Sequence, residues 1–182
     1  MSKSFQKQKI AQTQIIKYES SLNCRLITTR FNNNTFRENK SFCTKHKFAC
    51  AYFSPIPLSD RIALNTICFI LEMNNEKNEL SGIGVLRNIP QMFKYDAYTD
   101  RNYNRVAYIG NYHVTREDII ADEESNNFWQ YLECLCFKGK GHLKRGQGFT
   151  CFPLSILMNS KERIDILQKI IQIVKRKFQI QG

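Results

Sequence analysis

Hydrophobic residues of this chain gather in short runs that polar, turn-forming residues separate. The longest run covers residues 67–73 and is almost unbroken, which predicts a buried central strand that ends at Asn74. Small and apolar residues alternate over residues 80–87, so the two segments predict a hairpin with a polar connection. The glycines of the second segment, Gly82 and Gly84, indicate a close approach by another backbone, a neighbouring helix or a flat ligand.

The first part of the chain holds few hydrophobic runs. Residues 1–20 are polar and predict a tail or a frayed helix, and a short strand is expected at residues 26–29. Residues 32–41 are mostly turn-formers, so we expect them to separate that strand from the globular part. The pattern therefore predicts a basic, polar and partly flexible segment over residues 1–41 and one domain over residues 42–182.

The later segments alternate between strand and helix signals. A strand followed by a turn is expected at residues 103–112, and Thr115 is placed to cap a helix whose first turn is acidic. Residues 128–137 predict a strand or a helix, and residues 149–157 predict a returning strand and a turn.

The clearest predicted element is a C-terminal helix. Apolar residues recur at spacings of three and four from Ile164 to Phe178, and Asn159 or Ser160 is placed to cap the helix. Its other face is basic, and we favour a helix that docks on its own core over one that lies on a membrane or a duplex. A chain of 182 residues with this pattern predicts a single α+β domain, with a curved, mainly antiparallel sheet or small mixed barrel and a C-terminal amphipathic helix.

Charge is distributed unevenly along the chain, whose formal net charge is +11. Residues 1–50 and 137–182 each hold 10 Lys and Arg against 2 acids, whereas residues 51–136 hold 7 against 12. If the two basic ends meet in space, they form a positive face that attracts polyanions. The alternative is that the lysine-rich ends serve solubility alone.

Cysteine usage and the apolar runs suggest a compartment. Seven cysteines, an odd number, and a polar start argue against secretion, so we expect most cysteines to be small core residues. No run approaches the roughly 20 apolar residues that a bilayer-spanning helix needs. We therefore expect an intracellular protein without a membrane partner.

A loop of cations and glycines between residues 138 and 148 is the main candidate for function. Glycine lets the backbone approach a ligand closely, and basic side chains there suit a phosphodiester backbone. The predicted nucleic-acid-binding residues are Lys138, Lys140, His142, Lys144 and Arg145, and those for base stacking are Trp129, Phe137, Phe149 and Tyr108. The spacing matches neither a P-loop nor a dinucleotide fingerprint, and the alternative is an exposed hairpin tip.

Two further constellations are weaker candidates for chemistry. Cys43, His46 and Cys50 have a spacing that could offer zinc ligands, with Cys134 and Cys136 to complete the site, but buried core thiols are the favoured interpretation. We expect no metal and no cofactor. His113 and His142 with Lys144 could form a metal-independent ribonuclease, although nothing in the spacing requires it.

The segments at residues 70–75, 80–88 and 103–110 resemble uncharacterised basic proteins of large double-stranded DNA viruses, over roughly residues 48–150. The same order of elements is more distantly similar to PUA-like domains of the EVE and YTH type. That resemblance implies a small mixed barrel with a base-sized pocket beside a basic groove, walled by Trp129 and nearby tyrosines. The viral resemblance implies a location in the host cytoplasm or nucleus, or in a virion.

The sequence therefore predicts a non-enzymatic nucleic-acid-binding protein that binds RNA or a modified base through its basic, glycine-rich loop. One alternative is a structural, virion-associated protein that uses the same cations against an acidic partner, and the other is the ribonuclease. Each prefers a different ligand, so binding and cleavage assays separate them.

Overall fold

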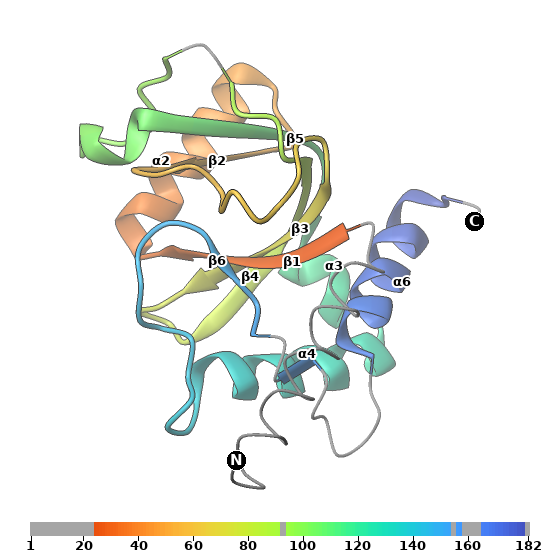
Figure 1. Cartoon of the computed structure of the whole chain (residues 1–182). Helices are drawn as coiled ribbons and strands as arrows, with labels where there is room; N and C mark the ends of the chain where they lie inside the picture. The colour runs from red at the N-terminus through yellow and green to blue at the C-terminus, as the bar shows by residue number, and fades with distance from the viewer. Residues whose placement is uncertain (1–23, 92–93, 154–155, 158–164, 181–182) are drawn as a thin grey trace, which may run out of the picture.

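The computed structural model describes residues 24–91, 94–153, 156–157 and 165–180, which form a curved sheet with helices on both faces (Figure 1). The six strands lie in the order β2-β5-β4-β3-β1-β6. They are β1 (Cys24–Phe31), β2 (Cys50–Ser54), β3 (Ile67–Asn74), β4 (Glu79–Arg87), β5 (Val106–Thr115) and β6 (Thr150–Cys151). Among the strands of the described residues, only the β1–β3 pair is parallel, which confirms the predicted α+β class and the mainly antiparallel sheet.

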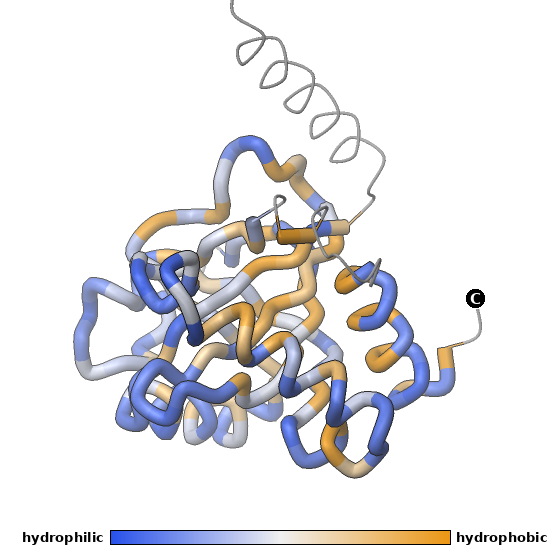
Figure 2. The backbone as a smooth tube through the Cα atoms, turned by 90° about the horizontal axis from the view of Figure 1, so that it is seen from below, coloured by the Kyte–Doolittle hydropathy of each residue, from blue (hydrophilic) through white to orange (hydrophobic). Residues whose placement is uncertain are grey.

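Helices cover the sheet from both sides and create two hydrophobic cores. They are α2 (Asn33–His46), the 3-10 helix η1 (Arg101–Arg105), α3 (Arg116–Ile120), α4 (Glu123–Phe137) and α6 (Ile166–Phe178). One core joins the sheet to α3, α4 and α6, and the other joins its opposite face to α2 and η1. Figure 2 shows the hydrophobic positions concentrated in the strands and on the side of α6 that faces them.

The short strand predicted at residues 26–29 is confirmed as part of β1, but the turn segment predicted at residues 32–41 is wrong; the tail predicted at residues 1–20 lies outside the described residues. Strand β1 lies inside the sheet between β3 and β6, and residues 33–46 form α2 rather than a turn. Asn32 and Thr35 explain the error, since they form a capping box: Asn32 Oδ1 accepts from Thr35 N at 2.7 Å, and Thr35 Oγ1 accepts from Asn32 N at 3.0 Å. The predicted domain boundary at residue 42 therefore falls within a helix, and the domain includes β1 and α2.

Several local predictions are confirmed. Strands β3 and β4 form the predicted hairpin, and Thr115 caps α3 by accepting a hydrogen bond from Asp118 N. Residues 128–137 belong to helix α4. The strand predicted within residues 103–112 begins at Val106, after η1, and the turn expected at its end is wrong because β5 continues to Thr115. Within the described residues, the returning strand shrinks to the two residues of β6.

The C-terminal helix docks on its own core, as predicted. It begins at Ile166 with Asp165 as its cap; the predicted caps, Asn159 and Ser160, lie outside the described residues. Its basic face is partly neutralised by ion pairs to α3, to α4 and to the residue that caps α4: Lys177–Asp118 at 2.6 Å, Lys169–Glu124, and Arg176–Asp122 at 3.0 Å. Among the described residues, no helix has the length and apolar character that a membrane crossing requires.

Candidate functional site

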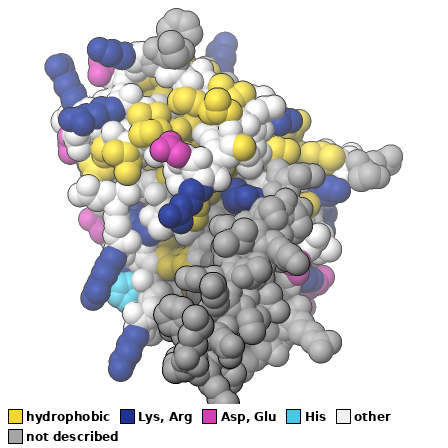
Figure 3. Space-filling model, in the orientation of Figure 1, with side chains coloured by type: hydrophobic (Ala, Val, Ile, Leu, Met, Phe, Trp, Pro, Cys, Tyr) yellow, Lys and Arg dark blue, Asp and Glu magenta, His cyan; other side chains and the backbone are white. Residues whose placement is uncertain are grey.

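The basic loop connects α4 to β6 and presents three cations to solvent. Lys138, Lys140 and Arg145 are exposed, and none of them forms an ion pair with another described residue. The chain turns at Gly139 and Gly146, whose φ angles of 77° and 114° lie in the region that favours glycine. Figure 3 shows Lys and Arg side chains projecting over the region where this loop lies in Figure 1.

Hydrogen bonds fasten the loop to the sheet. Arg30 of β1 donates from Nε to Leu143 O at 2.8 Å and from Nη1 to Thr150 Oγ1 at 2.9 Å. Asn75 donates to Lys144 O at 3.0 Å. Because these contacts come from β1 and from the end of β3, the sheet fixes the position of the loop.

The remaining two residues of the predicted set take part in this anchoring. Lys144 is half-buried and its Nζ donates to Asn78 Oδ1 at 2.7 Å. His142 is also half-buried, and its Nδ1 accepts from Lys144 N at 3.3 Å. The structure thus divides the predicted set into three exposed cations and two residues that hold the loop.

Two of the predicted stacking residues have no accessible face. Trp129 is fully buried in the core under α4, with Nε1 directed at Leu80 O at 3.3 Å. Tyr108 is 1% exposed, and its hydroxyl accepts from Leu58 N at 3.1 Å. Each ring is part of one of the two hydrophobic cores, so the stacking prediction is wrong for Trp129 and Tyr108. Phe137 and Phe149 are half-buried, and Phe149 meets the Tyr108 ring edge-on at a centroid distance of 5.4 Å.

A cavity of about 590 Å³ lies between the glycine end of the loop, the first turns of α2 and the segment around η1. Aromatic rings and hydrogen-bonding groups share its wall. The residues are Thr29, Arg30, Phe31, Asn32, Asn34, Thr35, Glu38, Phe53, Asn75, Tyr98, Thr99, Asp100, Tyr103, Gly146, Gln147 and Gly148. We call it the aromatic cavity. Neither Trp129 nor Tyr108 lines it, and sequence reasoning did not single out Tyr98 and Tyr103 or their partners from β1, β2 and α2.

Charge and unsatisfied hydrogen bonding mark the wall of the aromatic cavity. Burial lowers the pKa of Arg30 from its ordinary value, yet an arginine keeps its charge at neutral pH. Asn75 Oδ1 is buried and has no hydrogen-bond partner among the described residues. Buried acceptors of this kind are rare in proteins.

A second polar cluster lies under α2, where strands β2, β3 and β5 contribute one side chain each. Glu72 Oε1 accepts from the Tyr52 hydroxyl at 2.6 Å and lies 3.0 Å from His113 Nε2. Burial by itself lowers the pKa of His113, but the charge of Glu72 and the hydrogen bond to it prevail, so the pKa is raised. Burial raises the pKa of Tyr52 well above its usual value, so its hydroxyl stays protonated and donates.

The glycines of β4 make room for this cluster. A methyl group at Gly84 would overlap the Tyr52 hydroxyl, and one at Gly82 would press on Val114 O and crowd the Glu72 carboxylate and the His113 ring. The close approach predicted from these glycines is therefore real, and most of what approaches is side chain, together with the neighbouring strand.

The ribonuclease hypothesis gains no geometric support. His113 pairs with Glu72 under α2, whereas His142 contacts Lys144 in the basic loop. Within the part of the chain that the structure describes, no contact joins the two rings.

The zinc hypothesis also gains no geometric support from the described residues. In the described ranges, no three or more His, Cys, Asp and Glu side chains are placed to hold a metal ion. His46 stacks on Phe42 at a centroid distance of 4.2 Å. Burial raises the pKa of Cys43 to about 11 and that of Cys50 to about 12, which makes both poor thiolate donors at neutral pH. Cys134 is exposed on α4 and Cys136 is buried in the core.

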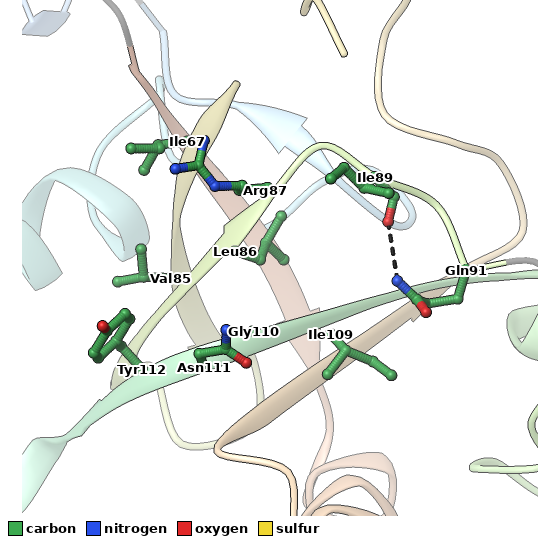
Figure 4. A pocket seen from close by; sticks show the side chains of 10 residues that line it. All are labelled: Ile67, Val85, Leu86, Arg87, Ile89, Gln91, Ile109, Gly110, Asn111 and Tyr112. Atoms are coloured by element: carbon green, nitrogen blue, oxygen red, sulfur yellow. Dashed lines mark hydrogen bonds between the residues drawn. The ribbon is translucent and has the colours of Figure 1, made fainter. Parts of the chain in front are cut away.

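A smaller cavity of about 280 Å³ on β4 and β5 is a poor candidate (Figure 4). Apolar side chains such as Val85 and Ile109 dominate its wall. Arg87, its one charged lining residue, already donates to Asn65 O at 3.1 Å, and Gln91 donates to Ile89 O at 3.4 Å. Few polar groups converge there, so the cavity lacks the means to orient a ligand.

Comparison with known proteins does not assign the chain to a group: no family model matches it, and no curated protein is similar to it. Fold and site geometry therefore carry the functional argument.

Proposed function

We propose that the protein binds nucleic acid without catalysing a reaction, using the basic loop for the phosphate backbone and the aromatic cavity for a base. The observation that carries this proposal is their adjacency: Gly146, Gln147 and Gly148 of the loop form part of the cavity wall. A strand held by the loop cations would thus pass the mouth of a cavity that suits a ring.

The exposed cations supply the affinity. Lys138, Lys140 and Arg145 have no competing carboxylate among the described residues, so each is free to neutralise a phosphate. Neutralisation releases condensed counterions and makes binding steeply dependent on salt. The anchoring by Arg30 and Asn75 fixes the loop at Leu143 and Lys144, just before Arg145 and the glycine end that lines the cavity.

The aromatic cavity supplies the contact to a base. Its volume of about 590 Å³ falls in the range of roughly 300–1,000 Å³ that small-molecule sites occupy. Tyr103 is half-buried and is the ring that a base can reach. It meets the buried Tyr98 edge-on at a centroid distance of 6.4 Å, and the buried Phe53 packs on Tyr98 at 5.5 Å, so the two buried rings support it from behind. Arg30 is half-buried in the same wall, and its guanidinium offers a donor to a base edge. An RNA base or a modified base is the ligand that this combination favours.

The loop's role is tested by replacing Lys138, Lys140 and Arg145 together with alanine. Fluorescence anisotropy with labelled single-stranded RNA should show weaker binding, and the slope of log K against log salt should fall by about 2, since each single-strand phosphate contact contributes about 0.7. The three side chains are exposed, so the fold should be retained.

A variant with the same loss of charge elsewhere is the matched control. Lys45, Arg61 and Lys175 are exposed and lie outside the loop, so their replacement by alanine should change the slope much less. Equal effects of the two triple variants would remove the loop from the proposal. If the loop variant loses binding to an acidic protein but binds RNA as the wild type does, the alternative of an acidic protein partner is supported.

A further inference from the structure

A third cavity, of about 570 Å³, lies on the opposite flank of α2 from the aromatic cavity. Helix positions Phe36, Lys40 and Cys43 line it, whereas Asn34, Thr35 and Glu38 line the aromatic cavity. Residues three and four apart share a helix face, so the two sets point to different sides of α2. The Glu72–His113 pair lies at this third cavity, which we call the histidine cavity.

Positive charge exceeds negative charge in the wall of the histidine cavity. Its charged lining residues are Lys40, Lys47, Glu72 and His113. When His113 is protonated, as its raised pKa favours, the wall carries an excess of two positive charges. Both lysines are exposed, and Lys40 Nζ sits 4.7 Å from the centroid of the Phe36 ring, which orients it at the rim.

The imidazole of His113 is held with one nitrogen free. Nε2 is bound to Glu72 Oε1, which is itself fixed by the Tyr52 hydroxyl. Nδ1 has no hydrogen-bond partner among the described residues, and the side chain is 18% exposed. A carboxylate on one ring nitrogen orients the ring and favours protonation, so that the other nitrogen is a donor.

We propose that the histidine cavity binds a phosphomonoester, with the phosphate at His113, Lys40 and Lys47. A phosphomonoester carries a charge between about −1.5 and −2 at neutral pH, which matches the excess charge of the wall. Phe36 and Phe48 line the same cavity and give an attached base a surface for stacking. The ligand is therefore a mononucleotide or the phosphorylated end of a strand. This proposal does not rest on the proposed function, because different residues carry it.

The test uses the loop variant with Lys138, Lys140 and Arg145 replaced by alanine, so that the loop cations do not contribute. Isothermal titration calorimetry with AMP should show binding, and adenosine should bind at least about tenfold more weakly, because a charge-assisted hydrogen bond is worth about 1.5–3 kcal/mol. Inorganic phosphate should compete with AMP.

Three substitutions in that background locate the site. Lys40→Ala and Lys47→Gly should each weaken AMP binding several-fold and together at least about tenfold. Glycine is chosen at position 47 because Lys47 has a φ of 58°, so the charge is removed without strain. Lys45→Ala, on the same helix but outside the cavity, is the control and should leave binding unchanged. AMP should shift the ring proton signals of His113 in NMR spectra of the protein that retains this residue. His113→Gln assigns those signals by their disappearance, and it should weaken AMP binding.

Two strand probes separate the sources of the phosphate. If a strand end is the ligand, an RNA with a 5′-phosphate should bind more tightly than the same RNA without it; if a mononucleotide is the ligand, the two RNAs should bind equally while AMP still binds. The proposal is overturned if AMP and adenosine bind alike, if neither binds, or if Lys45→Ala weakens binding as much as Lys40→Ala.

Discussion

Single glycines decide whether the polar cluster under α2 can form. Gly84 lies directly against the Tyr52 hydroxyl, so a side chain at this position and the hydrogen bond from Tyr52 to Glu72 exclude each other. The need for glycine at position 84 thus comes from a side chain on another strand. The local sequence indicates only that some group approaches the strand closely.

Gly84→Ala should destabilise the protein by about 1–3 kcal/mol, the usual effect of overpacking a core, because Tyr52 must move and lose its bond to Glu72. Urea unfolding monitored by circular dichroism measures the change. Gly141→Ala is the control, since a methyl group there meets nothing within 4 Å. Similar stabilities for the two variants would show that the Tyr52–Glu72 contact does not form in solution.

His113 gives stability a dependence on pH whose sign follows from its raised pKa. The charged pair with Glu72 contributes fully below the unfolded pKa of about 6.5, and the contribution is lost as pH rises through the higher folded pKa. Unfolding free energies from urea titrations at about pH 6 to 9 should therefore fall with pH in the wild type, and less so in His113→Gln. Parallel curves for the two proteins would contradict the pairing.

At the scale of elements, helix α2 organises the molecule. It covers one face of the sheet, its first turns line the aromatic cavity, and its other flank lines the histidine cavity. Buried Asn39 adds a link, since its side chain donates to Ala51 O at 2.8 Å and to the Tyr98 hydroxyl at 3.0 Å. Helix α2 therefore positions both candidate sites.

Asn32→Ala should cost about 1 kcal/mol, because it removes the side chain that caps α2. Ser41→Ala, at an exposed position inside the same helix, should change the unfolding free energy by less than about 0.5 kcal/mol. Thermal and urea unfolding measure both values. If Asn32→Ala is as stable as Ser41→Ala, the capping box does not hold the helix start.

Element prediction succeeded where a signal is local. The β3–β4 hairpin and the docking face of α6 follow from the runs and spacings of apolar residues along the chain. Thr115 predicts the start of α3 because it precedes two acidic residues. The start of α2 failed because asparagine and threonine favour both turns and helix caps, and only the tertiary contacts of the helix decide between them.

The sites were less predictable than the elements. The three exposed cations follow from composition, but the burial of Trp129 and Tyr108 depends on packing between distant segments. Glu72 and His113 are 41 residues apart, and the walls of the aromatic cavity come from five separate parts of the chain. Such pairings depend on strand order, which single-sequence patterns do not determine.

At the scale of the whole molecule, the candidate binding sites lie on the two flanks of α2 and on the basic loop. The glycine end of the basic loop lines the aromatic cavity, and the two together suit a strand with an accessible base, while the histidine cavity lies on the other flank of α2. A base inside a duplex is stacked and paired, so entry into the aromatic cavity favours single strands.

The most direct measurement is fluorescence-anisotropy binding of the purified protein to labelled single- and double-stranded RNA and DNA across a salt series. The proposed function predicts binding that weakens steeply with salt and is tighter for single strands than for duplexes of the same length. Absence of binding to all four at low salt would contradict it and would leave the exposed loop cations to an acidic protein partner.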